Sequence, residues 1–197
     1  MKQHKIVGAV FLAALLFSSI PTASAQELVT NGGFETGNFF GWTVVDASNN
    51  TNVGTDPLFA FQGNSYANLG ADPGIGTLSQ TIATTPGQSY QFSFALANDI
   101  TPPAGGNFFQ ALFGGQSVLT LNNLGDADYQ LYNYNVMASS TSTTIEFRYQ
   151  HGDDFFRLDS VSVVPEPSTV TLLGVASIGG LVAMRRRARR KAQASAA

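Results

Sequence analysis

Apolar and polar residues alternate along most of the central part of the chain. The clearest runs are residues 90–96 and 145–149, where aromatic or aliphatic side chains occupy every second position. Weaker versions span residues 109–113 and 78–82. A period of two is typical of strands that bury one face. Turn-forming pairs separate these runs, among them Pro86-Gly87, Pro102-Pro103, Gly114-Gly115 and Gly152-Asp153.

This pattern predicts an all-β fold with many short strands. We expect strands near residues 42–47, 64–70, 77–83, 88–97, 107–113, 116–121, 129–138, 142–150 and 155–163. No helical periodicity precedes residue 165, and no strict internal repeat favours a propeller or solenoid. Short strands at this spacing favour a β-sandwich, and we expect an antiparallel jelly roll of two sheets.

The first 25 residues have the parts of a secretory signal peptide. Lys2 and Lys5 precede an apolar run, and Ala23-Ser24-Ala25 supplies the small residues that a signal peptidase accepts. Cleavage after Ala25 would leave Gln26 as the first residue. The alternative is an uncleaved anchor, but the apolar run is shorter than the about 20 residues that a membrane span needs.

The C-terminal end has a second targeting pattern. The motif Pro165-Glu166-Pro167 precedes an uncharged apolar segment at 168–184, and a basic tail follows at 185–191. The apolar segment is about long enough for a transmembrane helix. Because basic clusters stay in the cytoplasm, the domain is expected outside and the tail inside.

These three parts resemble the PEP-CTERM sorting signal of Gram-negative bacteria. The resemblance implies recognition by exosortase, a membrane-embedded cysteine transpeptidase that cuts near residues 165–167. It also implies a transient inner-membrane anchor, and then transfer to the cell envelope or to extracellular polysaccharide. The alternative is a plain tail anchor in which the Pro-Glu-Pro sequence occurs by chance.

Residues 26–164 remain for the ectodomain, which is enough chain for one hydrophobic core. Only two of the chain's 10 basic residues lie there, Arg148 and Arg157, against 12 of its 13 acidic residues, so its formal charge is about −10. Such a charge repels phosphate backbones and argues against nucleic-acid binding. The chain has no cysteine, which excludes thiol catalysis and cysteine metal sites.

Two segments resemble the first and last strands of galactose-binding-like jelly rolls, the fold of many carbohydrate-binding modules. They are residues 28–35, followed by Gly41-Trp42, and residues 156–163; residues 78–82 and 86–94 resemble the paired central strands. In that fold the opening segment and the last strand often hold a structural calcium. The resemblance therefore gives Asn31, Glu35 and Asp159 as a candidate Ca²⁺ site, because this ion prefers carboxylate and carbonyl oxygens. The alternative is that the two carboxylates are solvated, or that Glu35 serves only the structure of its turn.

Aromatic side chains are the candidate sugar-binding groups, because sugars stack their apolar faces on aromatic rings. The candidates for ligand binding are Tyr66, Phe108, Phe109, Tyr132, Phe155 and Phe156, and Tyr129 and Tyr134 are further aromatic candidates. Adjacent rings such as Phe108 and Phe109 must point to opposite faces of a strand, so one of each pair is expected to be exposed. Core packing is the alternative for every ring, and Trp42 is assigned to the core.

No catalytic constellation is evident, and we expect a protein that is not an enzyme. The acid pairs Asp126 with Asp128 and Asp153 with Asp154 lie in turns and are typical of solvated residues, and His151 is expected at the surface. The sequence favours an exported envelope or matrix protein whose domain binds polysaccharide. The alternatives are a structural or adhesive domain that binds protein, and a small hydrolase.

Overall fold

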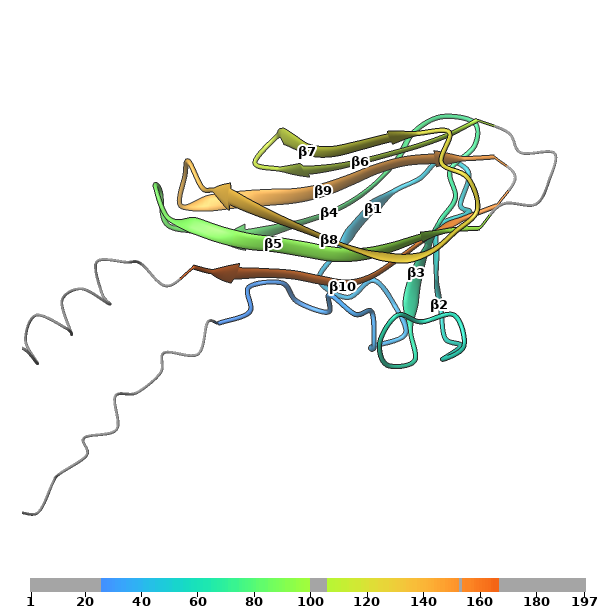
Figure 1. The fold of residues 1–197 in the computed structure, drawn as a ribbon, viewed down its shortest axis with the longest axis horizontal. Helices are drawn as coiled ribbons and strands as arrows, with labels where there is room; N and C mark the ends of the chain where they lie inside the picture. Colours follow the sequence, from blue (N-terminus) through green and yellow to red (C-terminus); the bar gives the residue numbers. More distant parts are fainter. Residues whose placement is uncertain (1–25, 100–105, 153, 167–197) are drawn as a thin grey trace, which may run out of the picture.

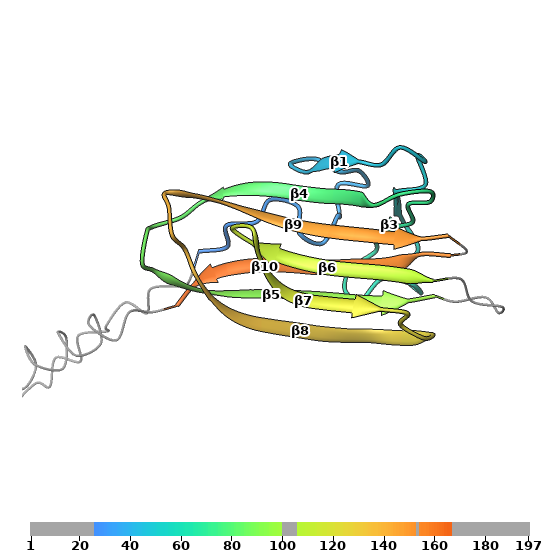
Figure 2. The same cartoon turned by 90° about the horizontal axis from the view of Figure 1, so that it is seen from above.

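The computed structural model describes residues 26–99, 106–152 and 154–166, and within them it confirms an all-β sandwich. Both sheets have five strands, and every pairing between neighbours is antiparallel. The first sheet has the order β1 (Thr43–Val45), β4 (Gly76–Ala83), β9 (Ser142–His151), β6 (Asn107–Phe113), β7 (Gln116–Asn122). The second has the order β2 (Asn52–Gly54), β3 (Tyr66–Leu69), β10 (Phe156–Pro165), β5 (Ser89–Asn98), β8 (Ala127–Met137). Figures 1 and 2 show the two sheets packed face to face.

All nine expected strands are present, with ends within a few residues of the expected ones. The sequence pattern missed β2, which has three residues and pairs only with β3. Its single apolar residue, Val53, gives no alternation to detect. The signal peptide and the C-terminal helix expected from the sequence lie outside the described residues. Among the residues that are described, no helix is long and apolar enough to cross a membrane.

Aromatic side chains from both sheets fill the core. Phe94 of β5 meets Phe147 of β9 edge to face, with ring centroids 5.2 Å apart, and Phe109 lies 5.3 Å from Phe156. All four rings are fully buried. Burying each such side chain contributes about 1.5–3 kcal/mol before the entropy cost of ordering it, so this cluster holds the two sheets together. Trp42 is buried as expected, and its indole N–H donates to the Asn31 carbonyl at 3.1 Å.

The strand directions place different segments of the chain at the two ends of the sandwich (Figure 1). Asn107 of β6 pairs with His151 of β9 at one end, where Phe156 begins β10. Pro165 ends β10 at the opposite end, beside Tyr90. The sorting motif therefore begins at the end of the sandwich that is remote from the start of β6.

Candidate functional site

A cleft opens at the end of the sandwich where β6 begins and β9 ends. Phe108 is the second residue of β6; its neighbour Phe109 points into the core and is fully buried, so the Phe108 ring lies on the outer face and is partly exposed. The cleft has a volume of about 500 Å³. Its lining residues are Asp72, Gly106, Asn107, Phe108, Asn123, Gln150 and Gly152.

Asn107 gives the cleft a fixed wall. Its side-chain Nδ2 donates to the Leu124 carbonyl at 2.8 Å, and its Oδ1 accepts from the Leu124 backbone N–H at 2.9 Å. Its own carbonyl accepts from the Asn123 N–H at 2.9 Å. These bonds tie the loop after β7 to the first residue of β6, and they leave the Asn123 side chain at the surface.

The opposite wall is polar. Gln150 lies directly across from Phe108 in the β6–β9 register, and its Nε2 donates to the Asp72 carboxylate at 3.3 Å. The cleft therefore combines one partly exposed aromatic ring with amide and carboxylate groups. Such a combination suits a neutral sugar, since the ring stacks on the apolar face while the polar groups bond the hydroxyls.

The structure removes most of the other aromatic candidates. Phe109 and Phe156 are fully buried in the core, so the expectation that they contact a ligand is wrong. Tyr66 is 7 % exposed, and Tyr132 packs against the core with its ring stacked on Phe94 at 5.4 Å. Of the two adjacent pairs, Phe108 and Phe155 are the partly exposed members, as the alternation required.

Phe155 lies against the backbone of the chain that leads into the cleft. A Cβ atom at Gly70 would come within 2.7 Å of the Phe155 ring, so only glycine permits this contact. Two residues later the backbone N–H of Asp72 approaches the Ser48 hydroxyl at 3.4 Å. Phe155 therefore supports the strand end behind the cleft, while Phe108 is the ring that lines it.

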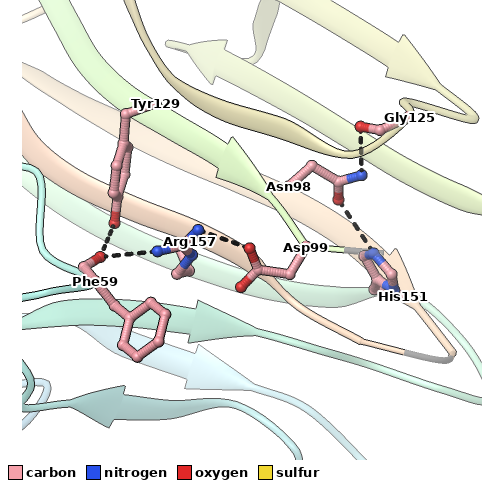
Figure 3. Close-up of polar contacts among 7 residues, drawn as sticks. All are labelled: Phe59, Asn98, Asp99, Gly125, Tyr129, His151 and Arg157. Atoms are coloured by element: carbon pink, nitrogen blue, oxygen red, sulfur yellow. Dashed lines mark hydrogen bonds and ion pairs between the residues drawn. The ribbon is translucent and has the colours of Figure 1, made fainter. Parts of the chain in front are cut away.

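His151 is buried, which corrects its expected place at the surface. Its Nε2 lies 3.1 Å from the Asn98 side-chain oxygen, and its Nδ1 accepts from the Asp154 N–H at 3.1 Å. The Asn98 amide nitrogen donates to the carbonyls of Leu124 and Gly125, so its oxygen must accept and the proton of His151 lies on Nε2 (Figure 3). The turn-like sequence His151-Gly152 gave no sign of this long-range contact.

A second pocket lies beside the bulge of β10. Its lining residues are Gly33, Glu35, Gln62, Gly63, Ser160, Val161 and Ser162. Glu35 Oε1 accepts the backbone N–H groups of Asn64 and Ser65, each at 2.8 Å. Gly63 has φ +76°, and a Cβ there would lie 2.3 Å from Glu35 Oε1, so glycine is required for this approach.

Asp159 lies behind this pocket with no exposed surface. Its Oδ2 accepts the N–H groups of Phe61 at 2.9 Å and Gln62 at 3.0 Å, and its Oδ1 accepts that of Ser160. Burial raises the pKa of the Asp159 carboxyl above 3.8, against these hydrogen bonds, and the nearby Glu35 charge raises it further. The pairing of β10 shifts register after Asp159, where Ser160 adopts φ 50°.

A hard cation such as Ca²⁺ prefers carboxylate oxygens, and Glu35 and Asp159 supply two neighbouring carboxylates. Without a counter-charge, their mutual repulsion and the burial of Asp159 destabilise the fold. The only basic groups hydrogen-bonded to acids in the described chain are Arg148 and Arg157, and their partners are Glu146 and Asp99. No cluster of three or more acidic or histidine side chains occurs in the described residues.

Asn31, the third residue of the expected calcium site, does not line this pocket. Its Nδ2 donates to the carbonyls of Asn38 and Phe40, at 2.9 and 3.3 Å, and its Oδ1 accepts the Thr36 N–H. These bonds close the loop that carries Glu35. In this structure Asn31 therefore positions the loop through its side chain.

Phe59, Tyr129 and Arg157 come together beside the second sheet (Figure 3). The Arg157 guanidinium bonds Asp99 at 2.6 Å and lies 5.2 Å from the Phe59 ring and 5.3 Å from the Tyr129 ring. Phe61 packs on Tyr129 with centroids 5.5 Å apart. Phe59, Phe61 and the neighbouring Leu58 remain 48 %, 43 % and 87 % exposed. The sequence gave Tyr129 as a sugar-binding candidate but did not indicate that the loop before β3 would meet it.

Comparison with known families identifies the C-terminal segment. Residues 163–187 match the model of the PEP-CTERM protein-sorting motif. The chain carries a PEP-CTERM sorting signal. A signal of this kind marks an exported protein with a C-terminal membrane-anchored sorting segment, and it implies processing by exosortase. A comparison of the whole sequence with curated proteins finds no match.

Solved structures share the fold of the described domain. TmCBM61, determined in complex with β-1,4-galactotriose, is 20 % identical over 72 % of this chain and 100 % of its own, with a TM-score of 0.58. The CBM22-1 xylan-binding domain of Paenibacillus barcinonensis Xyn10C is 12 % identical over 72 % of this chain and 96 % of its own, with a TM-score of 0.53. The C-terminal family 22 carbohydrate-binding module of Clostridium thermocellum Xyn10B is 14 % identical over 74 % of this chain and 97 % of its own, with a TM-score of 0.51. The domain therefore has the jelly-roll fold of carbohydrate-binding modules.

Proposed function

We propose that this protein is an exported, exosortase-processed component of the cell envelope or extracellular matrix whose β-sandwich binds polysaccharide without catalysis. The observation that carries the proposal is the cleft at the start of β6, where the Phe108 ring faces the side chains of Gln150 and Asp72. The fold shared with carbohydrate-binding modules supports it. A neutral or cation-bridged polysaccharide is the expected ligand, because the ectodomain carries an excess of acidic residues.

The place of the cleft agrees with this function. The start of β6 and the end of β10 lie at opposite ends of the sandwich (Figure 1). The cleft lies at the first end and Pro165 at the second, so a domain held at the membrane by its C-terminal end would present the cleft outward. The same cleft would face polysaccharide both before and after release. Asp126, in the loop before β8, and Asp128, the second residue of β8, are both exposed and line neither described pocket, which favours binding over hydrolysis.

A bound calcium ion is proposed as a structural element of the same domain. Glu35, which lines the pocket, and the buried Asp159 carboxylate behind it would hold the ion at the bulge of β10. When bound, the ion would supply positive charge to two acidic groups and fix the opening loop against the last strand. It takes no part in contacting the sugar in this proposal, because its pocket and the Phe108 cleft share no lining residue.

The test compares polysaccharide binding by the processed protein, recovered from exosortase-positive cells, with that of Phe108→Ala. Affinity electrophoresis on a panel of neutral and acidic polysaccharides should find a ligand, and Phe108→Ala should weaken its binding by at least about fivefold, as the loss of a central aromatic contact does. Phe61→Ala is the matched control, because it removes an exposed phenylalanine from the loop before β3, which does not line the cleft. Equal binding by wild type and Phe108→Ala, or binding to none of the panel, would refute the proposed cleft.

One observation favours a second function. The exposed rings of Phe59 and Phe61 lie beside Arg157 and Tyr129. Exposed apolar clusters are common at protein–protein contacts. If the domain is instead adhesive toward protein, Phe61→Ala should abolish the interaction and Phe108→Ala should leave it unchanged.

A further inference from the structure

The first residue of the sorting motif belongs to the folded sheet, and the second is hydrogen-bonded to it. Pro165 is the last residue of β10 and pairs with Tyr90 of β5. The backbone N–H of Glu166 donates to the Ser89 carbonyl at 3.0 Å. Gln88, in the turn before β5, also holds Glu166, because its Nε2 donates to the Glu166 carbonyl at 2.9 Å.

The strand that leads into the motif is also held on its other edge. β3 pairs only with residues 156–158 of β10. Beyond them, the segment that begins at Glu27 lies along the same edge of β10 and forms hydrogen bonds with it. Leu28 donates its N–H to the Val163 carbonyl at 3.1 Å, and Glu27 Oε1 accepts the Val163 N–H at 2.9 Å. Residues 163–166 thus have partners on β5, on the turn before β5 and on the first residues of the domain.

An enzyme that cuts a chain within or beside a motif must reach the backbone of that motif, and extended peptides are usually gripped through the same N–H and C=O groups that a sheet uses. Those groups of Glu166 are already bonded to Ser89 and Gln88. We propose that the folded domain masks its own sorting motif, so that exosortase removes the tail only when the end of β10 detaches from β5. This inference rests on the proposed processing by exosortase and adds a control of its rate.

The end of β10 is suited to such a control. It is a strand terminus, and strand termini open locally far more often than the core unfolds. Pro165 has no N–H to donate, so β10 can donate no hydrogen bond from that residue. The hydrogen bonds of Glu166 and the Glu27 carboxylate then set how often the motif becomes accessible.

The test follows tail removal from the full chain by pulse-chase in isogenic bacteria with and without exosortase. Gln88→Ala removes one side-chain bond to the motif and should shorten the half-time of processing about fivefold, the change expected when one net hydrogen bond is lost from an opening equilibrium. Gln116→Ala is the matched control, because Gln116 is an exposed glutamine at the start of β7 in the other sheet. It should process at the wild-type rate.

The opposite perturbation locks the strand. Gln91 and Val164 are direct cross-strand partners, and the chain has no cysteine of its own. The double variant Gln91→Cys with Val164→Cys brings two thiols to a spacing close to that of a disulfide. After oxidation in the exported compartment, its processing should be at least about tenfold slower than that of either single variant, and a reductant should restore the rate.

The outcomes separate the two claims. Loss of the tail at equal rates in both strains, or in neither, refutes processing by exosortase. Exosortase-dependent loss at one rate in Gln88→Ala, the oxidised double variant and wild type leaves that function standing and overturns the masking. Faster loss in the first variant together with slower loss in the second supports it.

Discussion

Asp159→Asn is the sharpest perturbation of the carboxylate pocket, because it removes a buried charge and keeps the shape of the side chain. In the wild type both carboxylate oxygens accept backbone N–H groups. The amide nitrogen of asparagine must face at least one of these donors, which costs about 1–3 kcal/mol, but the charge repulsion with Glu35 disappears. We expect the metal-free variant to lose about 1 kcal/mol of stability, or about 4 °C in Tm.

Asp159→Asn is expected to have a larger effect on the stabilisation that bound calcium provides. At a concentration of 100 times Kd, a bound ion stabilises the wild type by about 2.7 kcal/mol, which for a domain of this size is about 10 °C in Tm. Calorimetric melting with and without CaCl₂ measures this increment. Asp159→Asn and Glu35→Gln should each lose most of it. The control Glu146→Gln, a carboxylate on the other sheet that bonds Arg148, should keep it.

Either of two results would refute this reasoning. A wild-type Tm that does not respond to calcium would show that the domain binds no stabilising calcium ion. A full calcium increment in both Asp159→Asn and Glu35→Gln shows that the ion binds elsewhere.

Two further predictions concern pH. Because burial raises the folded-state pKa of Asp159 above 3.8, its ionised form destabilises the metal-free fold at neutral pH, and this penalty is relieved as pH falls through the folded pKa. The Tm of metal-free wild type relative to Asp159→Asn should therefore rise on acidification from pH 7. Over the same range, the Tm of calcium-bound wild type should lose its increment over that of the metal-free protein. Parallel curves of Tm against pH would contradict this. Asp46 behaves in the opposite way: burial alone would raise its pKa, but hydrogen bonds from Ser48 and Thr51 lower it below 3.8. Asp46→Asn should cost about 1–2 kcal/mol at pH 7, and urea unfolding should show that cost disappearing as pH falls below 3.8; a cost that is the same at pH 7 and pH 2.5 would count against it.

Much of the fold could be predicted from the alternation of apolar and polar residues. A strand of eight to eleven residues repeats its pattern often enough to be detected, as β5 and β9 do. β2 is three residues long and is held by its partner β3 rather than by its own pattern. The PEP-CTERM signal was predictable for a different reason, since its parts are contiguous in sequence.

The site was only partly predictable, because it depends on contacts between distant residues. The pair Phe108 and Phe109 required one ring on each face, but the register with Tyr149 decides that Phe109 is the buried one. Likewise, His151 resembles a turn residue until the packing of β5 brings Asn98 within 3.1 Å of it. Local sequence gives the faces of a strand, and the partner strand determines which face is buried.

The most direct measurement of the proposed function is an NMR titration of the processed, isotopically labelled protein with an oligosaccharide of the polysaccharide that binds best on the panel. The account predicts that the largest chemical-shift changes of backbone amides occur at Asn107, Phe108, Asn123 and Gln150. The amide resonances of Phe61 and Gln62 should not shift. Saturable binding that shifts the amides around Phe61 and leaves those of the cleft unchanged would contradict it.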